Sequence, residues 1–524
     1  MSFKPVACQK VGCNVANIRK NAEYCRIIHS WRECPKSMQR KFITNLVLLL
    51  FLNLLVKPFW IFGIDRVVQN TVGASEYGFY SAVFSFSFLF NILLDFGITN
   101  FNNRNIAQNS QLLNKHFSSI IVMKLMLGLG YLMLAFVIGM IIGYNEPRQM
   151  MFIGFMALNQ FLISFILYLR SNISGLLLFK TDSLISVLDR VLMIVFCGIL
   201  LWGGITDKTF RIEWFIYSQT AAYIFTAMVA FLVVVKKSSF RKFHWNRPFF
   251  IMILKQSLPF ALLTFLMSFY NRIDSVMLER LLPEGVGALQ AGIYAHSFRL
   301  LDAGNMIPYL FSVLLLPIFS QMTKQGDNVA KLIKLSFTML TVISVTVVAC
   351  SFFFNYELID LLYTSHIEES AVIFRVLMIG FIAISSTYVF GTLLTANGSL
   401  KELNIIAGSG MVLNLVLNLV LIPKYLALGS AYASVITQFL IVVCQIVVVT
   451  RKFRLKPDIS YLLRLAFYIL LVFATGWFAS GSGYSWYIGF GATALLSVIY
   501  AASLKLLHVR GLISIIREKP LIRS

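Results

Sequence analysis

Apolar segments long enough to cross a lipid bilayer follow one another along almost the whole chain. Inside lipid the backbone cannot hydrogen-bond to water, so such segments must form bundled helices or the strands of a closed barrel. Runs of this length indicate helices, and 58% of the residues are hydrophobic while only 13% are charged. We therefore expect an all-α polytopic membrane protein with about 14 transmembrane helices. The expected spans are 42–64, 77–99, 117–143, 149–170, 184–204, 213–235, 251–278, 291–320, 332–354, 371–396, 403–422, 427–450, 459–480 and 484–504.

One short phrase occurs twice, near the start of the second expected span and near the start of the eighth. Residues 72–84 read VGASEYGFYSAVF, and residues 286–298 read VGALQAGIYAHSF. A shared fragment precedes the copies, IDRV at 64–67 and IDSV at 273–276. A duplicated membrane hairpin predicts a transporter built from two repeats that move against each other. The matched pairs are Val72/Val286, Gly73/Gly287, Ala74/Ala288, Gly78/Gly292, Tyr80/Tyr294 and Phe84/Phe298.

The duplication predicts how the chain is organised. A basic cytoplasmic linker at 236–250 is expected to separate an N-terminal six-helix lobe, 42–235, from a C-terminal six-helix lobe, 251–450. Six spans lie between the two copies, so the lobes have the same orientation and a pseudo-symmetry axis along the membrane normal. Residues 451–524 hold an accessory helix pair and a basic tail outside the duplication.

The first 41 residues differ in character from the rest of the chain. They are polar and basic, lack the apolar core of a signal peptide, and hold four of the seven cysteines. The cysteine spacing lacks the paired CxxC of most zinc sites, so we expect reduced cytoplasmic thiols. Met38 directly precedes the first span, and residues 1–37 are therefore expected to be a dispensable extension or a mis-assigned start. The four cysteines are Cys8, Cys13, Cys25 and Cys34.

The net charge of +23 is explained by membrane topology. About 30 of the 45 Lys and Arg residues fall on one side of the predicted bundle, which is the positive-inside pattern. The loop at 355–370, on the other side, carries four carboxylates and no Lys or Arg. Both termini are therefore predicted to be cytoplasmic, and nucleic-acid binding is not expected.

Motifs of enzymatic chemistry are absent from the sequence. No Gly-Lys dipeptide occurs, so the chain cannot form a Walker loop for ATP phosphates. HExxH and GxSxG are also absent, and the six His residues are scattered. We expect a transporter rather than an enzyme, with no cofactor and no metal site, driven by a proton or sodium gradient or by the gradient of its substrate.

Charged residues within the expected spans are the candidate functional residues, because a charge at the bilayer centre costs on the order of 3 kcal/mol. Arg299 and Asp302 lie one helical turn apart in the eighth span, whereas Arg272 and Asp274 face different directions in the seventh. Either Arg299–Asp274 or Arg272–Asp302 is a salt bridge that locks the hairpin, or Arg299 faces a central cavity and binds pyrophosphate. The repeat aligns Arg299 with Ser85, so the backbone plan is duplicated and the charge is not.

The first lobe holds three more candidates. Lys57 precedes Pro58, which is expected to kink the first span and make it a moving, cavity-lining element. The alternative is a lysine that snorkels outward. Asp95 is expected either to neutralise Lys124 or to titrate with a coupled proton.

Four stretches of the chain resemble the multidrug/oligosaccharidyl-lipid/polysaccharide (MOP) exporter superfamily, and within it the Wzx-type polysaccharide (O-antigen) flippases. The resemblance covers most of residues 42–450. After LIPKY the family usually has Gly, where this chain has Leu426. The similar stretches are VGASEYGFYSAVFSFSFLFNILLDFGITNFNNRNIAQN (72–109), SLPFALLTFLMSFYNRIDSVMLERL (257–281), GIYAHSFRLLDAGNMIPYLFSVLLLPIFSQ (292–321) and NGSLKELNIIAGSGMVLNLVLNLVLIPKYLALGSAYAS (397–434).

The resemblance implies translocation of an undecaprenyl-pyrophosphate-linked oligosaccharide across the bacterial inner membrane by alternating access. Such a lipid-linked unit serves lipopolysaccharide O-antigen, capsule or exopolysaccharide, and a polysaccharide polymerase and a chain-length regulator are the expected partners. Alternatives are a lipid II flippase, a cation-coupled drug exporter and, more remotely, a membrane polysaccharide polymerase. The headgroup candidates are Arg299, Lys57, Arg272 and Lys124, and the coupling or salt-bridge candidates are Asp302, Asp274 and Asp95.

Overall fold

The computed structural model is helical, without strands, throughout the residues that it describes, which are 52, 55–99, 102, 106, 111–176, 178–203, 210–238, 247–455 and 458–506. The predicted extension of residues 1–41, with its cysteines and Met38, lies outside the described residues. In chain order the elements are the π-helix η1 (Phe59–Asp65), α3 (Arg66–Val72), α4 (Ala74–Leu89), the 3₁₀-helix η2 (Asn91–Leu94), α6 (Leu112–Ile142), α7 (Pro147–Gly175), α8 (Phe179–Trp202), α9 (Ile212–Val235), α10 (Arg247–Leu281), α11 (Val286–Gly304), α12 (Met306–Gln325), α13 (Ala330–Phe353), α14 (Asn355–Leu362), α15 (Ile367–Ala396), α16 (Leu400–Lys452), α17 (Ile459–Gly481) and α18 (Trp486–Ser503).

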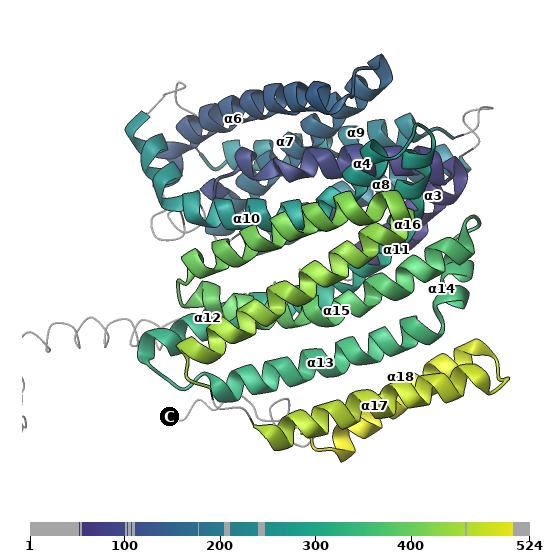
Figure 1. The fold of residues 1–524 in the computed structure, drawn as a ribbon. Helices are drawn as coiled ribbons and strands as arrows, with labels where there is room; N and C mark the ends of the chain where they lie inside the picture. Colours follow the sequence, from purple (N-terminus) through teal and green to yellow (C-terminus); the bar gives the residue numbers. More distant parts are fainter. Residues whose placement is uncertain are drawn as a thin grey trace, which may run out of the picture.

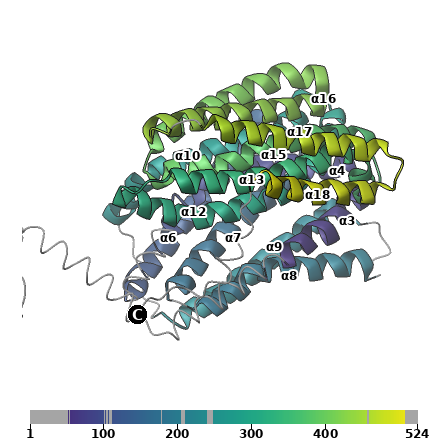
Figure 2. The ribbon, with the colours of Figure 1, turned by 90° about the horizontal axis from the view of Figure 1, so that it is seen from below.

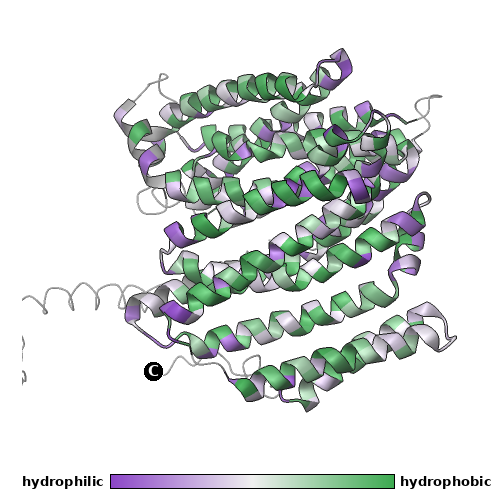
Figure 3. Cartoon of the chain, in the orientation of Figure 1, coloured by the Kyte–Doolittle hydropathy of each residue, from purple (hydrophilic) through white to green (hydrophobic). Residues whose placement is uncertain are grey.

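These helices form the polytopic membrane bundle that the sequence predicts. Within the described residues, nine helices are long and apolar enough to cross a membrane. One of them, α16, is 53 residues long and contains a break, so it corresponds to two of the expected spans. Hydrophobic residues follow one another along most of α6 and α17 (Figure 3). Ile141 and Leu463, for example, are 78% and 66% exposed, as expected for side chains that face lipid.

The helices divide into two lobes and an accessory pair (Figure 1). In the N-lobe, η1 to α9, helix α7 packs against α4, α6, α8 and α9. In the C-lobe, α10 to α16, helix α15 packs against α11, α12, α13 and α16. The accessory helices α17 and α18 pack on the outside of α13, where the hydroxyls of Thr346 and Ser497 hydrogen-bond at 2.7 Å. The helices of the N-lobe are inclined to those of the C-lobe (Figure 2).

The duplicated phrase of the sequence forms the closest contact between the lobes. A Cβ added to Gly78 on α4 would overlap the carbonyl oxygen of Ala288, and one added to Gly292 on α11 would overlap the backbone of Ala74. Each helix thus presents two small residues four positions apart, the pattern that lets membrane helices approach closely. The repeat therefore encodes the crossing at which the two lobes meet.

The second and eighth spans were expected to be continuous, and the structure corrects this. Helix α4 ends at Leu89 and is followed by η2, and α11 ends at Gly304 before α12 begins at Met306. In the register of the repeat Phe90 aligns with Gly304, so both breaks occur at the same place in the duplicated unit. Helix breaks within a membrane are tolerated where the freed backbone is buried in protein or lines a cavity, and they commonly mark transporter binding sites.

Two other helices deviate from regular geometry. Pro58, where a kink was expected, is followed by the π-helix η1, so the chain departs from regular α-helical geometry directly after the proline. In α16 the break falls at Leu426, whose φ of 54° and ψ of −134° lie outside the helical region. This is the position at which the resembled family has Gly, and the expected spans 403–422 and 427–450 lie on either side of it.

Candidate functional site

An ion pair joins the two lobes beside the crossing of α4 and α11. Arg299 on α11 has its Nε 3.3 Å from Oδ2 of Asp65, the last residue of η1. The same Nε donates to the Tyr77 hydroxyl at 3.1 Å, and that hydroxyl donates to Asp65 at 2.9 Å. Asp65 is only 2% exposed, so separation of the lobes here would leave a buried carboxylate without its cation.

The sequence suggested Asp274 as the salt-bridge partner of Arg299, whereas the structure pairs Arg299 with Asp65. The bridge to Asp274 is not formed, because the crossing of the two helices places Arg299 opposite η1 of the other lobe. The other pair considered, Arg272–Asp302, is present at 2.9 Å. Asp65 was not among the candidates, and the signal that could have found it is the Ile-Asp fragment that it shares with Asp274.

Two cations of the N-lobe gather near the same junction. The guanidinium of Arg190 on α8 lies over the ring of Trp60 at 5.7 Å and interacts electrostatically with Arg299. The Nε of Arg190 lies 3.7 Å from Oδ2 of the adjacent residue, Asp189. Lys57 interacts electrostatically with Arg190, and among the described residues it has neither an ion-pair nor a hydrogen-bond partner. Three cations from both lobes therefore gather around η1: Lys57 directly precedes this helix, Arg190 lies over its Trp60, and Arg299 pairs with its last residue.

The buried carboxylate of the C-lobe is held by neutral groups. Asp274 on α10 is 1% exposed and accepts hydrogen bonds from the Tyr294 hydroxyl at 2.8 Å and the Asn418 amide at 2.8 Å. The Asn414 amide lies at 3.3 Å, and Ser434 is a further partner. No Lys or Arg of the described residues forms an ion pair with it. Its negative charge is therefore compensated by neutral donors, the Tyr294 hydroxyl and the amide nitrogens of Asn414 and Asn418.

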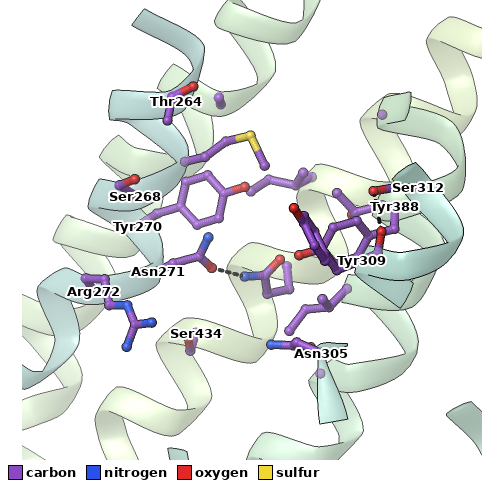
Figure 4. Close-up of a pocket in the computed structure, with 18 of the residues that line it drawn as sticks. Thr264, Ser268, Tyr270, Asn271, Arg272, Asn305, Tyr309, Ser312, Tyr388 and Ser434 are labelled. Atoms are coloured by element: carbon purple, nitrogen blue, oxygen red, sulfur yellow. Dashed lines mark hydrogen bonds between the residues drawn. The ribbon is translucent and has the colours of Figure 1, made fainter. Parts of the chain in front are cut away.

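A cavity of about 740 Å³ lies inside the C-lobe (Figure 4). Its walls come from α10, α11, α12, α15 and α16, and Phe88 of α4 adds an aromatic side chain from the N-lobe. Arg272 and Asp302 both line it. The guanidinium of Arg272 lies over the rings of Phe88 and Phe298 at 5.3 and 5.1 Å. Arg272 is therefore held by a carboxylate and two aromatic rings, which fixes its position in the wall.

Further contacts between the lobes surround the α4–α11 crossing. The Asn70 side chain on α3 donates to the carbonyl of Leu362 at the end of α14 at 3.0 Å. The Tyr144 hydroxyl, in the turn between α6 and α7, donates to Glu279 on α10 at 2.8 Å. These contacts join N-lobe segments to C-lobe segments near the N-terminal ends of α4 and α11, so the lobes are closed at that end.

Comparison with known proteins assigns the chain to a family. Residues 44–323, more than half of the sequence, match the model of a family described as polysaccharide biosynthesis protein. The chain belongs to the polysaccharide biosynthesis protein family. A relative in this comparison is an uncharacterized membrane protein of Methanocaldococcus jannaschii, which is 23% identical over 380 residues, or 70% of this chain and 88% of the relative.

The fold of this family member is similar to that of solved transporters. The lipid II flippase MurJ in an inward closed conformation has a TM-score of 0.64 at 15% identity, with 91% of this chain and 99% of MurJ covered. An inward-facing MATE family transporter of the MOP superfamily has a TM-score of 0.57 at 14% identity, with 79% and 98% covered. The predicted helical architecture is confirmed, and the predicted resemblance to the MOP superfamily is confirmed at the level of the fold.

One headgroup candidate of this polysaccharide biosynthesis protein is fully occupied by other groups. Lys124 on α6 is 1% exposed, and its ammonium donates to Asp95 at 2.5 Å, to the carbonyl of Leu94 at 2.9 Å and to the Ser164 hydroxyl at 2.9 Å. An ammonium has three donors, and all three are used. Lys124 therefore has no donor left for a phosphate, and Asp95 takes the neutralising role that was one of its two alternatives.

Proposed function

We propose that this polysaccharide biosynthesis protein moves an undecaprenyl-pyrophosphate-linked oligosaccharide across the bacterial inner membrane by alternating access. The observation that carries the proposal is the group of Lys57, Arg190 and Arg299 at the junction of the lobes. Cations inside a membrane bundle are costly, and an anion between them lowers that cost. A pyrophosphate fits because it offers several charged oxygens to the planar donors of two arginines.

Substrate binding and lobe movement would then be coupled through Arg299. The positive-inside pattern predicts that both termini are cytoplasmic; the closed end at α4 and α11 would then face outward, and the headgroup would enter from the cytoplasm. A pyrophosphate bound at Arg299 competes with Asp65 for the guanidinium. Loss of the Arg299–Asp65 contact weakens the closed end, and the bound anion thus favours the state that opens outward.

The gradient that drives transport would act at Asp274. This carboxylate is buried, lacks a cation among the described residues, and is held by neutral hydrogen-bond donors of α11 and α16. A proton or a sodium ion bound there would neutralise the C-lobe without touching the Arg299 site. Substitution of Asp274 by Asn is expected to abolish the dependence of transport on the gradient, which proteoliposomes with an imposed proton or sodium gradient would measure.

The other candidate functions fit the site less well or differ only in the glycan. A drug exporter for cations would require an acidic cavity, and the junction is cationic. A lipid II flippase would meet the same polyprenyl pyrophosphate, so this alternative differs in the sugar portion of the substrate. A polymerase would need extended catalytic loops, and the longest outer loop that the sequence predicts, at 355–370, has about 16 residues. Participation of a polymerase and a chain-length regulator as partners stays a prediction.

The decisive test is the replacement of Arg299 by Gln, with lipid-linked oligosaccharide measured on each leaflet. We expect translocation to fall about tenfold or more, since a charge-assisted hydrogen bond contributes roughly 1.5–3 kcal/mol. Arg299→Gln also leaves Asp65 buried without a cation, so the double variant Arg299→Gln/Asp65→Asn separates folding from transport. Its two amides can hydrogen-bond to each other, and translocation should still be lost.

The matched control is Arg464→Gln on α17, outside both lobes; among the described residues its guanidinium hydrogen-bonds to the carbonyl of Ser460 alone, at 3.2 Å. It should translocate as the unaltered protein does. Normal translocation by Arg299→Gln at normal expression would refute the role of Arg299 as a headgroup ligand.

A further inference from the structure

Arg299 loses its partner whenever the lobes separate at the closed end, near the N-terminal ends of α4 and α11. Its Nε lies 3.3 Å from Oδ2 of Asp65, which belongs to the other lobe. Asp65 is 2% exposed, and loss of one partner from a buried ion pair is strongly destabilising. A transporter can alternate only if its closed and open states lie close in free energy. Arg299 therefore needs a second partner, and that partner must move with the C-lobe.

Two carboxylates of the C-lobe are already occupied by other groups. Asp274 on α10 accepts hydrogen bonds at both oxygens, from the Tyr294 hydroxyl and from amides of α16. Tyr294 precedes Arg299 by five positions on α11, and at 3.6 residues per turn the two side chains lie on different faces. Glu279, near the end of α10, is paired with the adjacent Arg280. Neither carboxylate is therefore available to Arg299.

Asp302 lies one helical turn beyond Arg299 on α11. Residues three positions apart share a face of a helix, and these two side chains interact electrostatically. The Asp302 side chain is 30% exposed at the cavity wall, so other groups do not enclose it. Its Oδ2 accepts from Arg272 at 2.9 Å, and its Oδ1 has no hydrogen-bond partner within the described residues. A carboxylate can accept from two guanidinium groups at once, because each oxygen has two lone pairs.

Arg272 does not depend on Asp302 alone. Its guanidinium lies over the ring of Phe298 at 5.1 Å, in its own lobe, and over the ring of Phe88 at 5.3 Å. Aromatic faces attract a cation without neutralising it. Arg272 therefore keeps favourable contacts when it shares the carboxylate with a second guanidinium.

We propose that Asp302 is the alternate partner of Arg299 and a positioning residue of the transport cycle. In the closed state Asp65 of the N-lobe holds the guanidinium, and when this end opens the guanidinium turns to the free oxygen of Asp302. This role rests on the proposed function, in which the lobes alternate and Arg299 binds the pyrophosphate. Arg299 then has a carboxylate partner in both states, which keeps the two states close in free energy.

The exchange also gives the headgroup a way to leave. A pyrophosphate at Arg299 and the carboxylate of Asp302 compete for the same guanidinium donors, and the two anions repel each other. Arrival of the headgroup separates Arg299 from Asp65, and Asp302 then displaces the headgroup in the open state. The two carboxylates therefore act at different stages, Asp65 at entry and Asp302 at release.

Water is the rival partner of Arg299 in the open state, since a hydrated cavity would solvate the guanidinium without any carboxylate. The two alternatives differ in the effect of the charge on Asp302. If water suffices, removal of that charge leaves the balance between open and closed molecules unchanged. If Asp302 is the partner, its removal destabilises the open state alone.

The experiment measures the separation of the lobes in the substrate-free, full-length protein in lipid nanodiscs. Nitroxide labels on a ketone-bearing unnatural amino acid replace Asn145 and Glu284, which are exposed in the α6–α7 and α10–α11 turns. Pulsed electron paramagnetic resonance then reports the distance across the closed end. Asp302→Asn keeps an oxygen that accepts from Arg272 and removes the charge. We expect it to lower the ratio of open to closed molecules about tenfold, as for the loss of a charge-assisted hydrogen bond.

Asp65→Asn removes the partner of the closed state and should raise the same ratio about tenfold. The double variant Asp65→Asn/Asp302→Asn should return close to the unaltered ratio, because each state then lacks one partner. Its comparison with Asp65→Asn keeps the measurement sensitive when the unaltered protein is almost entirely closed. The matched control is Asp360→Asn, which removes an exposed carboxylate of α14 that has no ion pair among the described residues, and the ratio should not change.

Arg272→Gln separates a positioning role of Asp302 from a structural one. If Asp302 acts on the lobes only through its pair with Arg272, then Arg272→Gln and Asp302→Asn shift the ratio in the same direction. If Asp302 receives Arg299, Arg272→Gln leaves both of its oxygens to Arg299 and the ratio rises. The two partners of one salt bridge are therefore expected to have effects of opposite sign.

Two results would overturn this role of Asp302: an unchanged ratio when Asp302→Asn is added to Asp65→Asn, or shifts of the same sign in Asp302→Asn and Arg272→Gln. Neither result bears on the pyrophosphate, which the translocation assay of Arg299→Gln tests separately. Loss of translocation in Arg299→Gln, with no effect of Asp302 on the ratio, would leave the proposed function standing. A single closed distance in every variant would contradict alternation of the lobes, and both proposals would then fail.

Discussion

The two lobes share a helix plan, and they differ in the chemistry of their interiors. The N-lobe carries cations, with Lys124 fully buried and Lys57 and Arg190 near the junction. The C-lobe holds a neutral cavity and a buried carboxylate, Asp274, without a cation among the described residues. From this comparison we infer that the duplicated residues determine how the helices pack. The residues that were not duplicated determine what each lobe can bind.

The aspartates of the repeated Ile-Asp fragment show this most directly. Asp65 and Asp274 occupy the same position in the two lobes, and both are buried. Asp65 is neutralised by Arg299, which comes from the opposite lobe. Asp274 is held by hydroxyl and amide groups of its own lobe. One carboxylate is therefore sensitive to separation of the lobes, and the other can respond to an ion without any such movement.

The largest expected effect comes from breaking the buried ion pair of the N-lobe. Lys124→Met leaves Asp95 and the carbonyl of Leu94 without their donor, and removal of one partner of a buried pair costs about 3–5 kcal/mol. We expect a large drop in Tm, measured by thermal unfolding in detergent. The double variant Lys124→Met/Asp95→Asn removes the orphaned charge and should recover part of the loss.

The control for this pair is Lys334→Met, which removes an ion pair with Asp458 whose partners are 47% and 46% exposed. Water screens that pair, so the Tm should hardly change. Equal losses of Tm in Lys124→Met and Lys334→Met would contradict the expected difference between a buried ion pair and an exposed one. They would also contradict the charged character assigned to the N-lobe interior.

An intermediate effect is expected at the crossing that the lobes share. Gly78→Ala and Gly292→Ala each place a Cβ against the backbone of the opposite helix. Overpacking of this kind costs about 1–3 kcal/mol. The two variants should lose similar stability, and the double variant should lose less than the sum because both disrupt one contact. Thermal unfolding of the three variants checks this.

Gly130→Ala on α6 is the matched control, since nothing lies within 4 Å of the added Cβ. A glycine in a helix interior is less favourable than alanine by roughly 0.5–1 kcal/mol, so this variant should be unchanged or slightly stabilised. A loss of stability in Gly78→Ala with none in Gly292→Ala would show that the two helices do not pack symmetrically at the crossing. The repeated phrase would then contribute differently to the packing of each lobe.

Much of the fold could be predicted from the sequence because its cause is local. Lipid requires runs of apolar residues, and these runs located the helices of the bundle without tertiary information. The phrase around Gly78 and Gly292 was found as a repeat, and its meaning as a close contact became visible only when α4 and α11 were placed together. The breaks after Leu89 and Gly304 were missed: no proline lies beside the first, and at the second the signal of Gly304, Asn305 and Pro308 was present, although the span was predicted to be continuous.

The site was predicted less completely because its contacts join distant parts of the chain. Arg299 and the Arg272–Asp302 pair were identified because they are charged residues within predicted membrane spans. The free-energy cost of burying a charge in a membrane makes such residues rare. The partner of Arg299 could not be deduced, because spacing within one hairpin says nothing about η1 in the other lobe. The state of Gln445 was also beyond sequence reasoning: its buried Oε1 has no hydrogen-bond partner among the described residues, and nothing in a sequence distinguishes a paired glutamine from an unpaired one.

The smallest expected effect concerns a position at which the chain departs from the family it resembles. Leu426 has a φ of 54°, in the region that favours glycine, and a non-glycine residue held there costs about 1–3 kcal/mol. Leu426→Gly relieves this strain and loses part of the gain to the flexibility of glycine, so we expect a stabilisation of about 1 kcal/mol. Leu419→Gly, in a regular part of α16 and 50% exposed, should destabilise by about 1 kcal/mol instead. The opposite signs, measured by thermal unfolding, would show that the break in the C-lobe helix is imposed by its surroundings. Equal losses in both variants would mean that the Leu426 side chain itself stabilises the break, through packing that outweighs its backbone strain.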